Sequence, residues 1–291
     1  MSITLGEVQM TEIGRVAEVR PEAGSKEEHL RAQLHQFDGR WKGGYFEGDP
    51  LDPLGDSTYR ELGYISSLYA TYLCCIKPYV GSSTIALEIG PGRGAWTKAI
   101  LTCKPQEVWC LDALSREHNG FDDYVGIREN VNYVQVSDFL CDCLPANHFD
   151  YLFSFGCFCH LSPVAIREYF RNLWTKLRPG AHAFVMVADF DKYNRAFMDP
   201  KCNISRAVLI EPLNVRRRIW NRLAALAMQK RYPRESWTLQ DKEQGSDPRP
   251  GRFYHAGIQE TAALLRELGY SVLDVDIGTV LRDPIVHFSR P

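Results

Sequence analysis

The sequence predicts an α/β protein with a mainly parallel β-sheet, and three observations lead to this prediction. Short apolar runs alternate with helix-like segments from residue 84 to about residue 190. A glycine-rich turn follows the first apolar run at once. Two strand-like segments close the chain with no helix between them, which indicates a terminal antiparallel hairpin. With 291 residues, the chain is long enough for one large domain with additions.

The composition is ordinary for a globular protein. Hydrophobic residues make up 45% and charged residues 24%, and the net charge of −2 implies no overall attraction to nucleic acid or to an anionic membrane. No apolar run approaches the ~20 residues of a membrane span, and the polar N-terminus does not read as a signal peptide. The nine cysteines include no C-x-x-C pair, so reduced thiols and a cytoplasmic location are expected.

Residues 1–79 are expected to form an N-terminal helical arm and lid. Residues 26–37 have helical periodicity, and a second helix is predicted over residues 57–76, where it stops before a proline. Between them, residues 41–56 are rich in glycine, proline and aspartate but too aromatic for a plain linker. We expect this segment to fold over the functional site, with Tyr59 facing a cofactor or substrate.

Residues 80–291 are expected to form the main domain. Its predicted parallel strands are residues 84–88, 107–111, 132–136, 151–155 and 181–188. Its predicted helices are residues 95–101, 164–177 and 258–268, and its closing strands are residues 271–276 and 285–289. An insertion at about 199–252 contains a basic helix over residues 214–231, which we expect to act as a helical cap.

The turn after the first strand has the pattern E-x-G-x-G-x-G. It consists of Glu88, Gly90, Gly92 and Gly94. Glycines at such a turn let the backbone approach a ligand that a Cβ atom would exclude. The spacing differs from the G-x-G-x-x-G pattern of dinucleotide-binding proteins, which argues against a dehydrogenase.

Further polar and aromatic residues follow the other strands. Parallel sheets bind ligands beyond the carboxyl ends of their strands, so these positions are expected to converge. Asp112 follows the second strand, where its carboxylate can accept hydrogen bonds from ribose hydroxyls, although an acid at this position can also cap a helix. Asp138 and Phe139 follow the third strand, and Ser154 and Phe155 end the fourth.

In this order, the motifs resemble those of class I S-adenosylmethionine (SAM)-dependent methyltransferases, over roughly residues 80–190. The resemblance implies a Rossmann-like methyltransferase sheet and SAM as cofactor. It implies that Glu88 and the glycines hold the methionine part of SAM and that Asp112 holds the ribose. It also implies that Asp138 holds the adenine amino group and that Phe139 covers the adenine ring.

A narrower resemblance lies outside these motifs. Residues 56–64, 155–161, 188–194 and 252–257 resemble bacterial sugar O-methyltransferases, including those that act on methylated mannose oligosaccharides. The resemblance implies a sugar or oligosaccharide as the acceptor. Two alternatives stay open: an N- or C-methyltransferase of another small molecule, and a binding protein with a degenerate methyltransferase fold. The chain lacks the N/D-P-P-F/Y motif that many nucleic-acid methyltransferases carry after the fourth strand.

Four side chains near the strand ends are candidates for contact with the acceptor. His160 is the predicted general base, because an imidazole suits proton removal from a hydroxyl near neutral pH. The alternative is a histidine that packs against or caps the next helix. His255 is the rival base and an expected substrate contact. Asp189 is another expected substrate contact, and with Asp191 it could ligate Mg²⁺, unless both are ordinary loop acids. The sequence leaves homo-oligomerisation open.

Overall fold

We describe the fold from a computed structural model, which covers residues 26–35, 43–44, 48–53, 66–189, 191–192, 223, 254–280 and 283–291. Most of the predicted cap insertion lies outside these residues, and so do Tyr59 and the predicted start of the second helix. In the described part of the chain, no helix is both long enough and apolar enough to cross a membrane.

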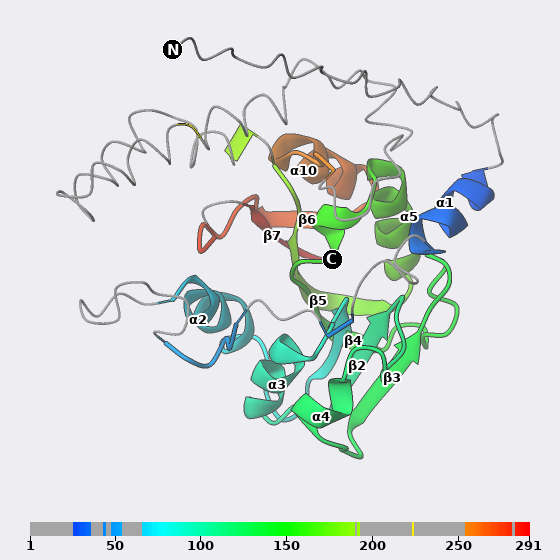
Figure 1. The fold of residues 1–291 in the computed structure, drawn as a ribbon. Helices are drawn as coiled ribbons and strands as arrows, with labels where there is room; N and C mark the ends of the chain where they lie inside the picture. Colours follow the sequence, from blue (N-terminus) through cyan, green and yellow to red (C-terminus); the bar gives the residue numbers. More distant parts are fainter. Residues whose placement is uncertain are drawn as a thin grey trace, which may run out of the picture.

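A seven-stranded sheet forms the centre of the molecule (Figure 1). The strands lie in the order β3-β2-β1-β4-β5-β7-β6. Their bounds are Ile85–Ile89 (β1), Glu107–Asp112 (β2), Val131–Gln135 (β3), Phe149–Ser154 (β4), Leu177–Met186 (β5), Ser271–Asp274 (β6) and Ile285–Ser289 (β7). The first five strands pair in parallel, whereas β7 pairs antiparallel with both β5 and β6. The predicted terminal hairpin is therefore confirmed, and β7 is inserted between β5 and β6.

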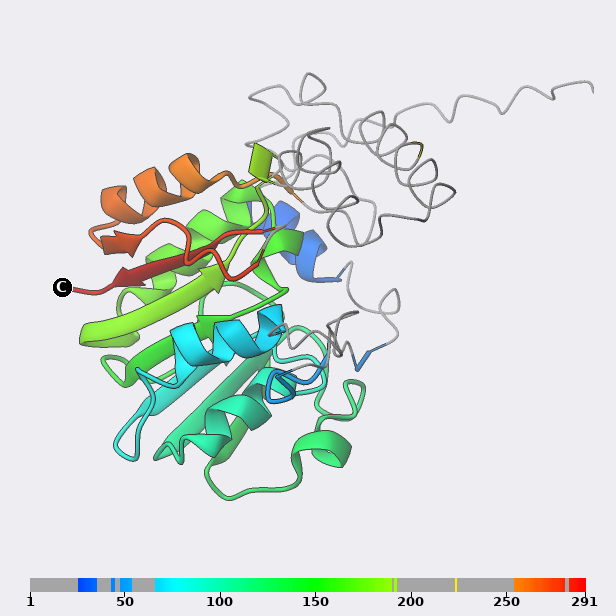
Figure 2. The same ribbon diagram turned by 90° about the vertical axis from the view of Figure 1, so that its left-hand side faces the viewer.

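Helices cover both faces of the sheet (Figures 1 and 2). On one face lie α1 (Lys26–His35), α5 (Pro163–Leu173) and α10 (Ile258–Glu267), which contribute residues such as Leu34, Phe170 and Leu265 to a buried core. On the other face lie α2 (Ser67–Thr71) with the π-helical turn Tyr72–Ile76, α3 (Ala95–Thr102) and α4 (Phe121–Val125). This is the three-layer arrangement of the class I methyltransferase fold.

The predicted boundary between α5 and β5 is wrong by several residues. We expected a helix to residue 177 and a strand from residue 181, but α5 ends at Leu173 and β5 begins at Leu177. Phe149 pairs with Leu177, whereas Tyr151 pairs with His182, so β5 has a bulge between these two pairs. Pro179 and Gly180 lie in this bulge and remain part of the strand. The Gly180 N–H donates to the carbonyl of Arg290 (2.7 Å), so the bulged backbone still has a partner.

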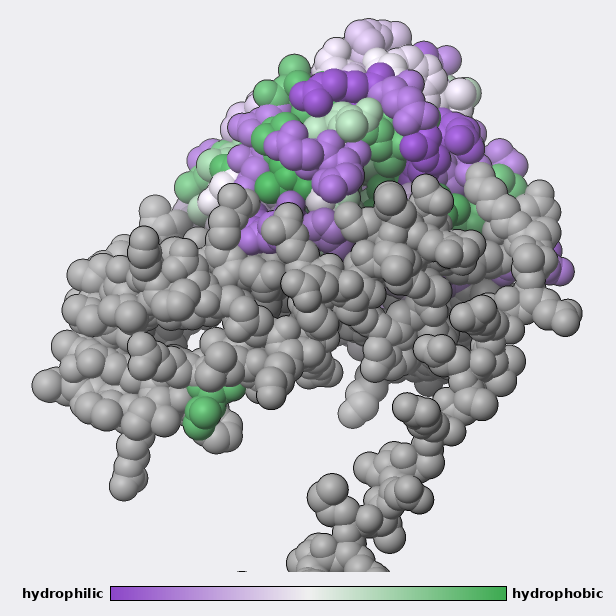
Figure 3. Space-filling view, turned by 90° about the horizontal axis from the view of Figure 1, so that it is seen from above, coloured by the Kyte–Doolittle hydropathy of each residue, from purple (hydrophilic) through white to green (hydrophobic). Residues whose placement is uncertain are grey.

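The described surface is mixed in character. In the view from above, hydrophilic residues predominate and hydrophobic residues are scattered among them (Figure 3). The large hydrophobic side chains that the described residues expose are Ile127, Leu140, Leu223 and Leu273. They lie far apart in the sequence and on different elements.

Candidate active site

The turn between β1 and α3 carries the three predicted glycines. Gly90, Gly92 and Gly94 have φ values of 73°, 53° and 96°, a region that favours glycine. A Cβ atom on Gly90 would overlap the side chain of Cys157, and one on Gly94 would overlap that of Val125. Both positions therefore require glycine for conformation and for space.

Glu88 lies behind this turn, on the side of the sheet that α3 covers. Its side chain is 2% exposed, and its Oε2 accepts a hydrogen bond from Thr97 Oγ1 (2.6 Å). Burial, together with the charge of Asp112, raises the pKa of Glu88 to about 8. Glu88 is not among the residues that line the pocket described below. Its side chain points toward α3, away from the pocket.

Asp112, at the end of β2, lies directly beside the glycine turn. Its Oδ2 accepts a hydrogen bond from the Gly92 N–H (3.1 Å), and its Oδ1 accepts one from the Leu114 N–H (2.9 Å). Burial raises the pKa of Asp112, whereas these hydrogen bonds and the neighbouring Asn119 side chain lower it. The predicted ribose-binding acid is thus held by two backbone donors.

A pocket joins the carboxyl ends of β1, β2 and β4. The residues that line it are Leu34, Gly43, Ile89, Gly90, Gly92, Leu111, Asp112, Ala113, Leu114, Asn119, Phe155, Gly156, Cys157, His160, Leu161 and Tyr169. Most of this wall is apolar, and among the described residues that line it Asp112 and His160 are the ionisable groups other than thiol and phenol. The N-terminal arm contributes Leu34 from α1 and Gly43. The predicted residues Gly90, Gly92, Asp112, Phe155 and His160 therefore come together in one place.

The end of β4 supports this pocket in two ways. The Ser154 hydroxyl is buried and donates to the carbonyl of Ile89 (2.7 Å), so it ties β4 to β1. Phe155 lines the pocket, and its ring centroid lies 4.7 Å from that of Trp96. Of the two predicted residues, Phe155 faces the pocket and Ser154 braces the sheet beneath it.

His160 lines the pocket from the last position of the 3₁₀ turn Phe158–His160. The cap of the following helix belongs to another residue, because Ser162 Oγ accepts the hydrogen bond from the Ala165 N–H (3.3 Å). Gln33 of α1 donates to the same hydroxyl and accepts from the Ser162 N–H (3.3 Å). The arm is thus bonded to the loop that carries His160.

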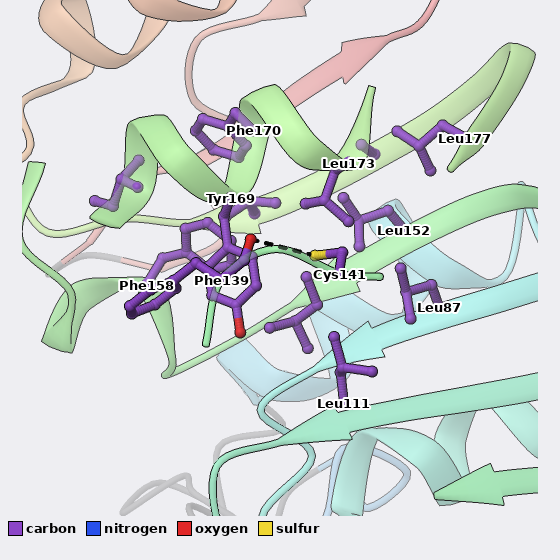
Figure 4. Close-up of a cluster of buried hydrophobic side chains, with 14 of the residues drawn as sticks. Leu87, Leu111, Phe139, Cys141, Leu152, Phe158, Tyr169, Phe170, Leu173 and Leu177 are labelled. Carbon is purple, nitrogen blue, oxygen red and sulfur yellow. Dashed lines mark hydrogen bonds between the residues drawn. The ribbon is translucent and has the colours of Figure 1, made fainter. Parts of the chain in front are cut away.

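Phe139 and Tyr169 form an aromatic pair beside the pocket (Figure 4). Phe139 is 1% exposed and does not line the pocket, and its ring centroid lies 4.8 Å from that of Tyr169 in an edge-on arrangement. Tyr169 extends from α5 and does line the pocket. Asp138 is half-buried and also outside the lining, and its Oδ1 accepts from the Leu140 N–H (2.9 Å).

Asp189 has a hydrogen-bonding role within the fold. It is 5% exposed, and its two oxygens accept from the N–H groups of Lys192 (2.7 Å) and Ile258 (2.8 Å). It therefore connects the end of β5 to the start of α10. Asp191 lies nearby, but in the described part of the chain no group of three or more His, Cys, Asp or Glu side chains is arranged to hold a metal ion.

His255 lies on a segment that runs next to the loop of His160. The Tyr254 N–H donates to the carbonyl of Cys159 (3.1 Å), and the Ala256 N–H donates to that of Ala188 (3.0 Å). The two candidate bases are therefore on adjoining segments, although only His160 lines the pocket. Tyr59, the other expected substrate contact, is outside the described residues.

Sequence reasoning missed most of the apolar pocket wall, and three residues show why. Leu34 and Tyr169 occupy apolar faces of amphipathic helices, and nothing in a single sequence separates a pocket wall from a core on such a face. Asn119 precedes a glycine, and this dipeptide reads as a turn. The one feature of the sequence that could have indicated a role in the site is its position, seven residues after Asp112 on the loop that follows β2.

Known proteins are similar to this chain over part of its length. A family model described as a methyltransferase domain matches residues 76–275. None of the curated proteins compared with the sequence matches it.

Several solved structures are similar in part. The YcgJ protein from Bacillus subtilis is 20% identical with a TM-score of 0.36, and the match covers 46% of this chain and 59% of that one. A 1,6-didemethyltoxoflavin-N1-methyltransferase from Burkholderia thailandensis is 17% identical with a TM-score of 0.45, over 77% of this chain and 78% of that one. A SAM-dependent methyltransferase from Mesorhizobium loti is 14% identical with a TM-score of 0.48, over 77% and 98%. The chain thus spans less than two thirds of the Bacillus subtilis structure.

Proposed function

Because this chain belongs to the methyltransferase domain family, we propose that it is a SAM-dependent methyltransferase that methylates a hydroxyl group of a sugar or oligosaccharide. The observation that carries the proposal is the pocket in which the glycine turn, Asp112 and His160 meet. We also propose that it acts in the cytoplasm on a small-molecule acceptor rather than on nucleic acid.

The pocket wall suggests how the cofactor would lie. We place the methionine part of SAM against Gly90 and Gly92, where a backbone without Cβ atoms allows close approach. Glu88 would not touch this part of SAM directly; it would support the glycine turn that does. The ribose would lie at Asp112. The order of the strand ends along the sheet supports these positions.

The adenine would then lie at the apolar side of the pocket, near Leu111 and Tyr169. Tyr169 offers its ring to this side, and Phe139 supports that ring from behind, so we propose that Phe139 acts on the adenine through Tyr169. Asp138 would accept from the adenine amino group with Oδ2, because its Oδ1 already accepts from Leu140.

Bound SAM supplies an electrophilic methyl group on a sulfonium. The apolar side chains of Leu34, Leu161 and Tyr169 would exclude water from the space around it. A neutral alcohol is a weak nucleophile, so His160 would take the hydroxyl proton as the acceptor oxygen forms its bond to the methyl carbon and the carbon–sulfur bond breaks. The charge that leaves the sulfonium then rests on the imidazolium.

The choice of a sugar as acceptor rests on the second resemblance. The described parts of three of the four stretches that carry it, residues 155–161, 188–189 and 254–257, meet beside the pocket through the backbone hydrogen bonds of Cys159 and Ala188. Segments far apart in the sequence that resemble one family and converge near the proposed base are best explained by a shared acceptor site. No metal ion forms part of the proposal.

The test is an acceptor screen with SAM labelled in its methyl group. The purified chain is incubated with sugars, oligosaccharides, phenols and amines, with and without EDTA. We expect label on a sugar oxygen, at a rate that EDTA does not change. Transfer only to nitrogen or carbon acceptors would overturn the sugar assignment. Calorimetry that showed binding of NAD, but not of S-adenosylhomocysteine (SAH), would overturn the methyltransferase assignment.

A further inference from the structure

Asn119 connects three parts of the pocket that come from different elements. Its side chain is 1% exposed and lines the pocket. Its Oδ1 accepts a hydrogen bond from the Gly44 N–H (3.2 Å), and its Nδ2 donates to Tyr133 Oη (2.8 Å). The same side chain lowers the pKa of the Asp112 carboxylate. Both the carbonyl and the amino group of this amide therefore have partners on other elements.

A chain of hydrogen bonds leads from Asn119 to the carboxylate of Asp112. Tyr133 Oη accepts from Asn119 and donates to the carbonyl of Leu114 (2.9 Å). The N–H of Leu114 donates in turn to Asp112 Oδ1 (2.9 Å). A chain of this kind fixes the direction in which the free lone pairs of the carboxylate point.

The N-terminal arm contacts the start of the same chain of hydrogen bonds. Gly43 lines the pocket, and a Cβ atom at this position would overlap the carbonyl oxygen of His118, the residue before Asn119. The arm backbone therefore rests directly on the loop from β2. A turn-forming asparagine would need none of these contacts, because the turn requires only its backbone and the following glycine.

We propose that Asn119 is a positioning residue that sets the Asp112 carboxylate for the two hydroxyls of the SAM ribose. The inference rests on the proposed function, since it assumes that Asp112 binds the ribose. It predicts that Asn119 controls how strongly the site prefers a complete ribose over a deoxyribose. A residue that only stabilised the loop would change the affinity for both ligands by the same factor.

The experiment measures the affinities of SAH and 2′-deoxy-SAH by calorimetry. For the wild-type protein, we expect the deoxy analogue to bind roughly ten- to a hundredfold more weakly, because a buried acceptor loses its partner. In Asn119→Ala this ratio should fall to about threefold or less. Asn119→Asp keeps the shape and the acceptor for Gly44 but loses the amide donors, so the ratio should fall in the same way. This near-isosteric variant tests the inference if the alanine variant does not fold.

Asn130→Ala is the matched control. Its Nδ2 donates to the carbonyl of Pro105 (3.3 Å) and it does not line the pocket, so its ribose preference should equal that of the wild type. Asn119 variants that keep the wild-type ratio, whatever their absolute affinity, would overturn the inference and leave the proposed function intact. A wild-type protein that did not bind SAH would overturn both.

Discussion

His160 is the residue on which the proposed chemistry depends most directly. We predict that His160→Ala lowers kcat by roughly 10²–10⁴-fold and leaves SAH affinity nearly unchanged, because none of the proposed cofactor contacts involves His160. The kcat of the wild type should decrease on the acid side of the ordinary imidazole range, since a protonated ring cannot accept a proton. Steady-state kinetics across pH, with calorimetry of SAH, measures both effects.

Ser162→Ala separates catalysis from helix capping. Ser162 caps α5, so its loss should lower the free energy of unfolding by ~1 kcal/mol while turnover of the folded enzyme stays close to normal. If His160→Ala behaved like Ser162→Ala, with a lower melting temperature and full turnover, His160 would be a structural residue.

The buried carboxyl group of Glu88 should make the free energy of unfolding depend on pH. Its folded pKa of about 8 lies above the ordinary glutamate value of 4.5, so the folded state binds more protons than the unfolded state between these two pH values. Its contribution to stability is present below about pH 4.5 and is lost as the pH rises toward 8. Glu88→Gln stays neutral, so it should be more stable than the wild type at pH 8–9, by roughly 2–4 kcal/mol, with little difference near pH 5.

Thermal unfolding at several pH values measures this difference. Glu117→Gln is the matched control, because Glu117 is exposed and its substitution should leave the pH dependence unchanged. A constant difference between Glu88→Gln and the wild type across this range would show that Glu88 is ionised throughout.

Residues differ in how far the sequence alone could predict them. The glycines and Asp112 have a fixed place next to a strand end, so the pattern of the strands predicted where they lie. Asn119 and Tyr169 reach the pocket through the path of a loop and the rotation of a helix. Neither of these is set by local sequence, and a buried polar side chain looks the same in the sequence whether its partner is a turn or a binding-site carboxylate.

At the scale of elements, the arm residues 43–44 are the part of the proposed lid that the structure shows against the pocket. We predict that Gly43→Ala weakens SAH binding by roughly tenfold, because the new Cβ atom would overlap the backbone of His118 and its φ of 69° would be strained. Hydrogen exchange should also show faster exchange in residues 43–53 of the variant, and in the wild type SAH should slow this exchange.

Gly81→Ala is the control for this substitution. No atom lies within 4 Å of a Cβ built on Gly81, and its φ is not in the left-handed region, so affinity and exchange should stay as in the wild type. Equal exchange of residues 43–53 with and without SAH would contradict the lid.

The helices and strands also show where hydrophobic periodicity alone is enough to predict secondary structure. The sheet and its hairpin were predicted correctly because long apolar runs must be buried, whatever their partners. The start of β5 was not, because the Pro179-Gly180 dipeptide is typical of a turn, whereas here the Gly180 N–H pairs with the carbonyl of Arg290. The five-residue helix α4 was missed for a similar reason: it is too short to show a period, and Phe121 and Val125 define it through packing.

At the scale of the whole molecule, a pair of histidines joins the terminal hairpin to the parallel sheet. His182 Nδ1 and His287 Nε2 lie 2.9 Å apart across β5 and β7, and Phe184 stacks on His287 at 4.1 Å. Burial and the neighbouring ring lower the pKa of His287 to about 4. The unfolded state therefore binds more protons than the folded state between pH 6.5 and 4, and stability decreases as the pH falls through this window.

We predict that the wild type loses roughly 1–2 kcal/mol of stability between pH 7 and pH 4.5 through this pair, an amount reduced by partial solvent screening. His287→Gln should remove most of this acid dependence, whereas His148→Gln, on a half-buried histidine outside the hairpin, should retain it. Urea unfolding at several pH values measures the slopes. Parallel slopes for the wild type and His287→Gln would rule out the pair as the source.

The inserted position of β7 also has a consequence for how the chain is made. Met186, at the end of β5, finds its sheet partner in Ile285, about 100 residues later. At a synthesis rate of ~5–20 residues per second, β5 leaves the ribosome some 5–20 seconds before the strand that will cover its edge. During that interval the growing chain presents an apolar strand with unpaired backbone groups, which is the feature that chaperones bind and that drives nascent chains to associate.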